Sequence, residues 1–131
     1  MAILDTDCLV GLIRGHPDAL RKLAVLASRR ESIATTAVNV AEIFRGAHLA
    51  SDPARALSRA RTVLGPLPIL PLDGPAGEEY GRIVADLERR GSPVGHMDSM
   101  VGAISRLAGE TIVTRNARHF SRIPGLAVDS W

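Results

Sequence analysis

Four carboxylates stand where they could act together on a substrate. Asp5 follows a short apolar run, and Asp7 comes two residues later. Glu42 lies in the second turn of one predicted helix and Asp98 in the first turn of another. Like charges sharing a pocket raise each other's pKa, and a divalent cation relieves their repulsion. Oxygen ligands without thiolates or paired histidines favour Mg²⁺ or Mn²⁺, which activates water, so we predict metal-assisted hydrolysis of a phosphoester.

Each carboxylate also has a simpler explanation. An aspartate after a strand often caps a helix or makes a turn, and one in a helix's first turn is favoured by the helix dipole. A single glutamate in a helix usually faces solvent. The prediction of a site therefore depends on whether the fold brings Asp5, Glu42 and Asp98 together.

Other phosphate chemistries lack their motifs. The chain has no P-loop, no dinucleotide-binding glycine pattern and no nucleophile elbow. No two of its four histidines have the spacing of a metal-binding pair such as His-x-x-x-His. The stretch Asp5-Thr6-Asp7 is similar to the aspartyl-phosphate motif of haloacid-dehalogenase-like phosphatases. Lys22, however, is the only lysine among the 16 basic residues. The later lysine that this motif and phospho-accepting receiver domains require is therefore absent.

The elements that must position these residues alternate between strand and helix. Apolar runs predict strands at residues 2–4, 32–35, 68–72, 111–114 and 126–128. Helical patterns cover residues 6–13, a segment opening at 16–18, and residues 37–49, 53–64, 74–90 and 97–108. Such alternation predicts an α/β fold, a three-layer α/β/α sandwich around a central, mostly parallel sheet of about five strands. Ligands of these sheets bind beyond the carboxyl ends of the strands.

Local signals refine these elements. Thr6 or Asp7 is expected to cap the first helix, and Thr36 the helix that follows the second strand. The prolines within residues 68–72 place that strand at an edge of the sheet. No linker or repeat divides the chain, so we expect a single domain spanning residues 1–131.

Composition limits the classes of function. The hydrophobic fraction of 46% is enough for a core, whereas 3% aromatic residues argues against binding single strands by stacked rings. Cys8 is the single cysteine, which excludes an internal disulfide and a cysteine metal cage. The amino-terminal residues lack the features of a signal peptide, and we expect a cytoplasmic protein.

Four segments together resemble the PIN-domain ribonucleases and, within them, the VapC-like toxins of toxin–antitoxin pairs. Residues 3–7, Ile-Leu-Asp-Thr-Asp, are similar to the opening motif, and residues 36–46 to the second, with Glu42 at its acidic position. Residues 89–98 are similar to the third motif, which ends on Asp98, and residues 114–120 to the fourth. Residues 124–131 match the usual tail. The resemblance runs nearly end to end, and its strength lies in four motifs in order at family-like separations.

This resemblance implies a PIN-like sheet and an acidic pocket that binds Mg²⁺ or Mn²⁺. Asp5 and Asp98 would be direct metal ligands, and Glu42 would act directly or through water. The implied activity is endonucleolytic cleavage of RNA, typically tRNA or rRNA. The implied partners are an antitoxin that fills the groove and inhibits the toxin, and a second copy of the chain in a homodimer.

The fourth motif departs from the family's fullest acidic form. Many members carry a further carboxylate where this chain has Asn116 or, at the other candidate position, His119. Asp7 partly restores the missing charge if it faces the same pocket. Thr6 and Thr114 are candidate hydrogen-bonding partners of the pocket, although helix capping and strand termination explain them equally well.

The arginines supply candidate contacts to the RNA backbone, namely Arg45, Arg82, Arg115 and Arg118. The leading hypothesis is therefore a Mg²⁺-dependent endoribonuclease that acts as a toxin, with Asp5, Glu42, Asp98 and Asn116 in the catalytic site. A catalytically silent module that binds RNA or protein through the same groove is the alternative. A small phosphatase is the third possibility.

Overall fold

Five short strands form one sheet in which every neighbouring pair is parallel. The computed structural model describes all residues 1–131. The strands are β1 (Ala2–Leu4), β2 (Ile33–Thr36), β3 (Ile69–Leu70), β4 (Thr111–Thr114) and β5 (Val128–Ser130), in the order β3-β2-β1-β4-β5. In the register of the central strands, Ile3 lies beside both Ala34 and Ile112. The predicted sheet is confirmed, and its central strand is the one that Asp5 follows.

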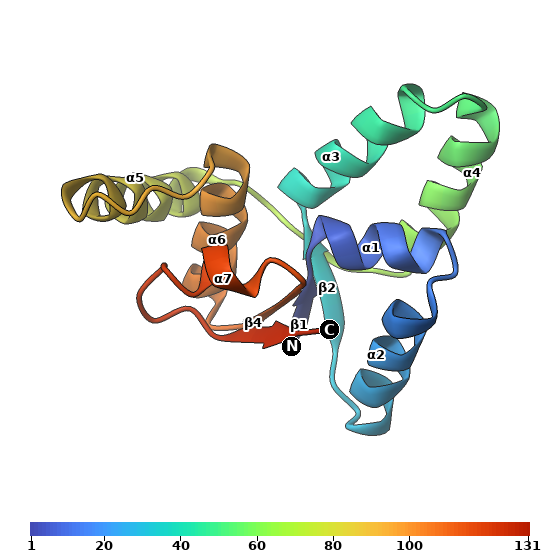
Figure 1. Ribbon diagram of the computed structural model, residues 1–131, viewed down its shortest axis with the longest axis horizontal. Coiled ribbons are helices and arrows are strands. Elements are labelled where there is room, and N and C mark those ends of the chain that lie inside the picture. Colours follow the sequence, from blue (N-terminus) through green and yellow to red (C-terminus); the bar gives the residue numbers. More distant parts are fainter.

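Seven helices cover the two faces of this sheet (Figure 1). On one side lie α1 (Thr6–Ile13), α2 (Pro17–Ser28), α3 (Ala37–His48) and α4 (Pro53–Leu64), and on the other α5 (Gly74–Arg89), α6 (His96–Ala108) and α7 (Ala117–Phe120). Alternate strand residues point to opposite faces. Leu4 and Val113 accordingly pack in an apolar cluster with residues of α1, α2, α3 and α4. Ile3 and Ile112 pack on the other face, in a cluster with residues of α5, α6 and α7. The three-layer α/β/α sandwich is confirmed.

The predicted boundaries were correct where a local signal fixed them. Thr36 caps α3 by accepting a hydrogen bond from the backbone N–H of Asn39. The strand β3 lies at the edge of the sheet, as its flanking prolines predicted. The strand β4 spans the predicted residues, and Gly109 ends α6 with a positive φ of 71° that favours glycine.

Two expectations were wrong, and one short helix was missed. Asp5, rather than Thr6 or Asp7, occupies the N-cap position of α1, because the side chains of Thr6 and Asp7 bond to distant segments. The last strand begins at Val128, two residues later than predicted, where the register with β4 places it. The single turn α7 was not predicted, since four residues are too few to show a helical period. No helix is long and apolar enough to cross a membrane.

Candidate active site

Asp5 is fixed at the centre of the site by two side chains from other elements. It is only 5% exposed at the carboxyl end of β1. One carboxylate oxygen, Oδ1, accepts a hydrogen bond from Asn39 Nδ2 at 2.9 Å. The other, Oδ2, accepts one from the hydroxyl of Thr114 at 2.8 Å, at the end of β4. The orientation of Asp5 is therefore determined by α3 and β4 together.

The electrostatic environment of Asp5 favours protonation when no cation is present. The pKa of Asp5 is raised from its ordinary value to about 6, mainly by burial and also by the charges of Asp7 and Asp98, against the lowering effect of the Thr114 hydrogen bond. Burial also raises the pKa of Glu42, and the charge of Asp98 acts in the same direction. Because the charge of Asp98 acts on the pKa of both Asp5 and Glu42, the fold brings these three predicted carboxylates near one another.

Asn39 was missed as a functional candidate by the sequence reasoning. It is fully buried in the first turn of α3, where its Oδ1 accepts a hydrogen bond from the Thr36 hydroxyl at 2.7 Å. Its Nδ2 donates to both Asp5 and the hydroxyl of Thr6. The available signal was a polar residue at the same helical face as Ile43 and Ala47, four and eight residues later. A buried amide on an apolar face needs partners, and here the partners belong to the site.

Glu42 is held through Thr6. The Thr6 hydroxyl donates to Glu42 Oε1 at 3.0 Å and accepts from Asn39 Nδ2 at the same distance. A continuous chain of hydrogen bonds therefore joins Glu42, Thr6, Asn39 and Asp5. Thr6 lies in the first turn of α1, and Glu42 lies about one turn after Asn39 on α3. These hydrogen bonds therefore couple the two helices.

The third carboxylate, Asp98, has polar partners from the segment after β4. Asn116 Nδ2 lies 3.1 Å from Asp98 Oδ2, and His119 Nδ1 lies 3.4 Å from the same oxygen. Asn116 and His119 are also within 2.8 Å of each other. Both candidate residues of the fourth motif, Asn116 and His119, therefore lie next to Asp98. The other histidine near this helix end, His96, instead lies 2.7 Å from the hydroxyl of Tyr80.

Asp7 is already engaged by protein donors on both of its oxygens. Its Oδ1 accepts a hydrogen bond from Trp131 Nε1 at 2.9 Å. Its Oδ2 accepts from the backbone N–H of Arg115 at 3.0 Å and lies 3.2 Å from the Thr114 hydroxyl. Asp7 therefore contributes charge next to Asp5, while its side chain links α1 to the segments after β4 and β5.

The donor set suits a hard divalent cation. No lysine or arginine side chain forms an ion pair with Asp5, Asp7, Glu42 or Asp98, so their negative charge is balanced by nothing but the polar donors described above. The available ligand atoms are carboxylate and amide oxygens, which Mg²⁺ and Mn²⁺ prefer. No three histidine, cysteine, aspartate or glutamate side chains converge on one point at coordinating distance. Water would therefore complete the coordination of an ion there, as is usual for magnesium.

The candidate RNA-contacting arginines differ in whether an ion pair within the protein already engages the guanidinium. Arg82 pairs with Glu79 at 2.5 Å, in an ion pair that Arg106 shares. Arg115 lies directly after Thr114, with its guanidinium 3.8 Å from the ring centroid of Trp131 and 3.4 Å from Asp18. Arg45 and Arg118 are exposed and form no ion pair; the latter is in α7 beside the site. Arg115 and Arg118 lie on either side of Asn116 and Ala117 in the chain, next to the Asn116 side chain that meets Asp98.

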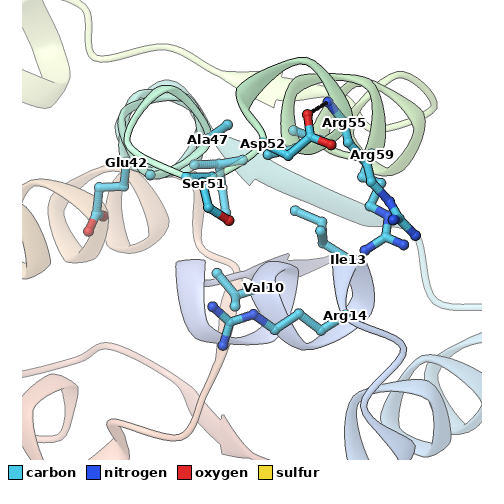
Figure 2. Close-up of a pocket in the computed structure, with 14 residues that line it drawn as sticks. Val10, Ile13, Arg14, Glu42, Ala47, Ser51, Asp52, Arg55 and Arg59 are labelled. Atoms are coloured by element: carbon cyan, nitrogen blue, oxygen red, sulfur yellow. Dashed lines mark hydrogen bonds between the residues drawn. The ribbon is translucent and has the colours of Figure 1, made fainter.

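A groove of about 520 Å³ extends from the site between α1, α3 and α4 (Figure 2). Glu42 lies at one side of it, and apolar residues including Val10, Ile13 and Ala47 form its walls. Three arginines, Arg14, Arg55 and Arg59, line it as well, and Asp52 is its one other acidic residue. The carboxylate of Asp52 accepts the backbone N–H of Arg55 as the cap of α4. The groove is therefore apolar inside and predominantly basic away from Glu42.

Comparison with known proteins places this geometry in context. A family model described as "PIN domain" matches residues 2–126. The "tRNA(fMet)-specific endonuclease VapC" of Salmonella typhimurium is 32% identical over 129 residues, which cover 98% of this chain and 96% of that protein. Two solved structures are similar over 99% of this chain. They are VapBC2 of Rickettsia felis bound to a promoter DNA fragment (TM-score 0.91, 27% identity, 98% of that chain) and DNA-bound VapBC of Salmonella typhimurium (TM-score 0.89, 31% identity, 97% of that chain).

Proposed function

The chain belongs to the PIN domain family and within it is VapC-like, and from this premise we propose that it is a metal-dependent endoribonuclease acting as the toxin of a toxin–antitoxin pair. The observation that carries the proposal is the buried, doubly hydrogen-bonded Asp5, whose pKa is raised to about 6 beside Asp7 and Asp98 without a cationic side chain to balance them. Perturbed carboxylates that converge in this way are typical of functional sites.

Asp5 and Asp98 would hold a Mg²⁺ or Mn²⁺ ion, with Glu42 acting directly or through water. When bound, the ion would supply Lewis-acid activation of water and neutralise charge at the scissile phosphate. The chain's own part is to hold the carboxylates before the substrate arrives. Asn39 and Thr114 orient Asp5, Thr6 orients Glu42, and Asn116 orients Asp98. Such outer partners of ligands commonly change metal affinity or activity 10- to 100-fold when they are removed.

The substrate we propose is a structured RNA of the tRNA or rRNA class. Arg115 and Arg118 lie beside the carboxylates and would contact the phosphates that flank the cleaved bond. Arg45, exposed on α3, would contact backbone further along. The ion pair with Glu79 makes Arg82 the weakest of the four candidates. Support for a tRNA substrate comes from the Salmonella relative, whose name describes a tRNA endonuclease.

The partner we propose is an antitoxin that occupies the groove between α1, α3 and α4. Both similar solved structures are of VapBC, which the description of another similar structure names as a family of toxin–antitoxin systems. A segment that presents apolar side chains to Val10, Ile13 and Ala47 and carboxylates to Arg55 and Arg59 would fit the charge and polarity of the walls (Figure 2). Because Glu42 lines the same groove, an occupant there would also hinder access to the carboxylates. We further propose that the toxin is a homodimer.

Incubation of the purified chain with tRNA and rRNA in Mg²⁺, Mn²⁺ or EDTA tests this function. We expect cuts at discrete positions that require the metal. They should be lost in Asp5→Asn and in Asp98→Asn while the circular dichroism spectrum is retained. Retarded migration of RNA without cuts would instead favour a silent binding module, and release of phosphate from a monoester would favour a phosphatase.

A further inference from the structure

Trp131, the only tryptophan of the chain, makes three contacts with residues around the proposed site. Its indole Nε1 donates to Asp7 Oδ1 at 2.9 Å. Its ring lies beneath the guanidinium of Arg115, 3.8 Å from the centroid, and meets the ring of His16 edge-on at 6.0 Å. Asp7, Arg115 and His16 come from α1, from the turn after β4 and from the start of α2. One side chain therefore joins three segments that are distant in sequence.

The surrounding residues are built to seat this ring. A side chain at Gly11 would place a Cβ 2.8 Å from Ala19 Cβ and 3.0 Å from Trp131 Cη2, so glycine leaves room for both α2 and the indole. Lys22, the only lysine, donates to the backbone oxygen of Ser130 at 3.0 Å and pairs with Asp129 at 2.7 Å. Its side chain is 13% exposed. Lys22 therefore fastens the segment that carries Trp131 onto α2.

The hydroxyl of Thr114 connects Asp7, the hydrogen-bond acceptor of Trp131, to Asp5. It has one proton and two carboxylate oxygens within reach, Asp5 Oδ2 at 2.8 Å and Asp7 Oδ2 at 3.2 Å. The same oxygen accepts a hydrogen bond from the backbone N–H of Asn116, and its single proton can be donated to only one of the two carboxylates at a time. The orientation of Asp5 therefore depends on how strongly Asp7 competes for that proton. Asp7 competes less when other donors satisfy it.

We propose that Trp131 is a positioning residue, which by donating its indole N–H to Asp7 leaves the Thr114 hydroxyl to orient Asp5. The inference rests on the proposed function, because Asp5 is the carboxylate that it prepares for the metal. Without the indole N–H, Asp7 retains the Arg115 backbone N–H, and we expect it to compete more strongly for the Thr114 proton. Asp5 then loses one of its two fixed hydrogen bonds.

Trp131→Phe tests this because phenylalanine keeps an aromatic ring beneath Arg115 and removes the N–H. We expect kcat for RNA cleavage to fall about 10-fold with KM within about twofold of the parent, and Mg²⁺ affinity measured by calorimetry to fall in parallel. If the protein folds poorly with phenylalanine, Lys22→Gln loosens the same segment and retains the indole. A smaller loss in the same direction is then expected. Parental kcat and Mg²⁺ affinity in both variants would overturn the proposal.

A double-mutant cycle with Asp7→Ala separates positioning from a general loss of packing. If Trp131 acts through Asp7, Trp131→Phe should change kcat and Mg²⁺ affinity less than about twofold once Asp7 is already alanine. Full additivity of the two substitutions would contradict this route. If the parent cleaves no RNA, the endoribonuclease proposal fails, and the calorimetric cycle still decides the role of Trp131. If the parent cleaves and the cycle is additive, only the positioning role fails.

Discussion

Asn39, with no exposed surface, donates its side-chain amide to Asp5 at 2.9 Å. The same nitrogen also donates to the hydroxyl of Thr6, and the amide oxygen of Asn39 accepts a hydrogen bond from the Thr36 hydroxyl. Asn39 therefore supports two carboxylates of the site, Asp5 directly and Glu42 of α3 through the Thr6 hydroxyl. This relationship sets the first prediction.

Asn39→Ala should weaken both folding and catalysis. Loss of the amide leaves a buried Asp5 oxygen without its partner, which costs about 1–3 kcal/mol of unfolding free energy. Loss of orientation should lower kcat about 10- to 100-fold. Val38→Ala is the matched control, because the neighbouring buried residue loses apolar volume on the same helix without a polar contact. It should destabilise the protein and keep the parental kcat. A parental kcat in Asn39→Ala would contradict the orienting role.

Asp5→Asn should stabilise the metal-free protein while it abolishes cleavage. Burial raises the pKa of Asp5 from an ordinary 3.8 to about 6, so the folded state binds the proton more tightly than the unfolded chain. The contribution of Asp5 to stability is therefore fully present below about pH 4 and is lost as the pH rises through about 6. A rise of about two in the pKa corresponds to at most about 3 kcal/mol of unfolding free energy.

Chemical unfolding in EDTA between pH 4 and pH 8 measures this effect. The free energy of unfolding of Asp5→Asn minus that of the parent should grow between pH 4 and pH 6 and then level off. Asp86→Asn, which removes a half-buried carboxylate of α5 that pairs with Arg90, is the matched control for the loss of a carboxylate outside the site. A difference that is flat across this range would mean that Asp5 titrates normally in the folded protein.

Asn116→Asp should make folding more dependent on the metal. The amide of Asn116 donates to Asp98, and a carboxylate there would place two like charges side by side. We expect lower thermal stability in EDTA and Mg²⁺ affinity at least equal to that of the parent. Calorimetric titration and thermal unfolding with and without Mg²⁺ measure both. A clear loss of Mg²⁺ affinity would argue against a place for residue 116 in the metal site.

Arg55→Glu combined with Arg59→Glu should release the protein from the antitoxin that we propose and keep the proposed RNA cleavage at the parental rate. Both arginines line the groove on α4, away from the carboxylates (Figure 2). Reversal of two charges in a groove that we expect to receive an acidic segment should weaken binding at least 10-fold. Arg29→Glu, outside the groove at the end of α2, is the charge-matched control. Unchanged inhibition of the double variant by the antitoxin would place the antitoxin elsewhere.

Much of the fold could be predicted because its signals are local. The strand β4 is a short β-branched run bounded by Gly109 and by polar residues, and the prolines beside β3 identified an edge. The last strand was misplaced because residues 126–130 carry little periodicity, and only pairing with β4 selects which of them extend the sheet. The cap of α1 was misassigned for a related reason, since Thr6 and Asp7 have partners 36 and 124 residues away.

The sequence by itself predicted the type of chemistry, because Asp5, Glu42 and Asp98 stand at a strand end and in early helical turns of a chain with one lysine. This placement predicted an acidic site at one edge of a parallel sheet. Only the tertiary structure decided which side chains hold those carboxylates. Asn39, Thr114 and Trp131 each looked like core, strand-end or tail residues in sequence. Their donor atoms meet the acids because parallel strands bring their carboxyl ends to one edge, and hydrogen bonds of fixed length then select the partners within reach.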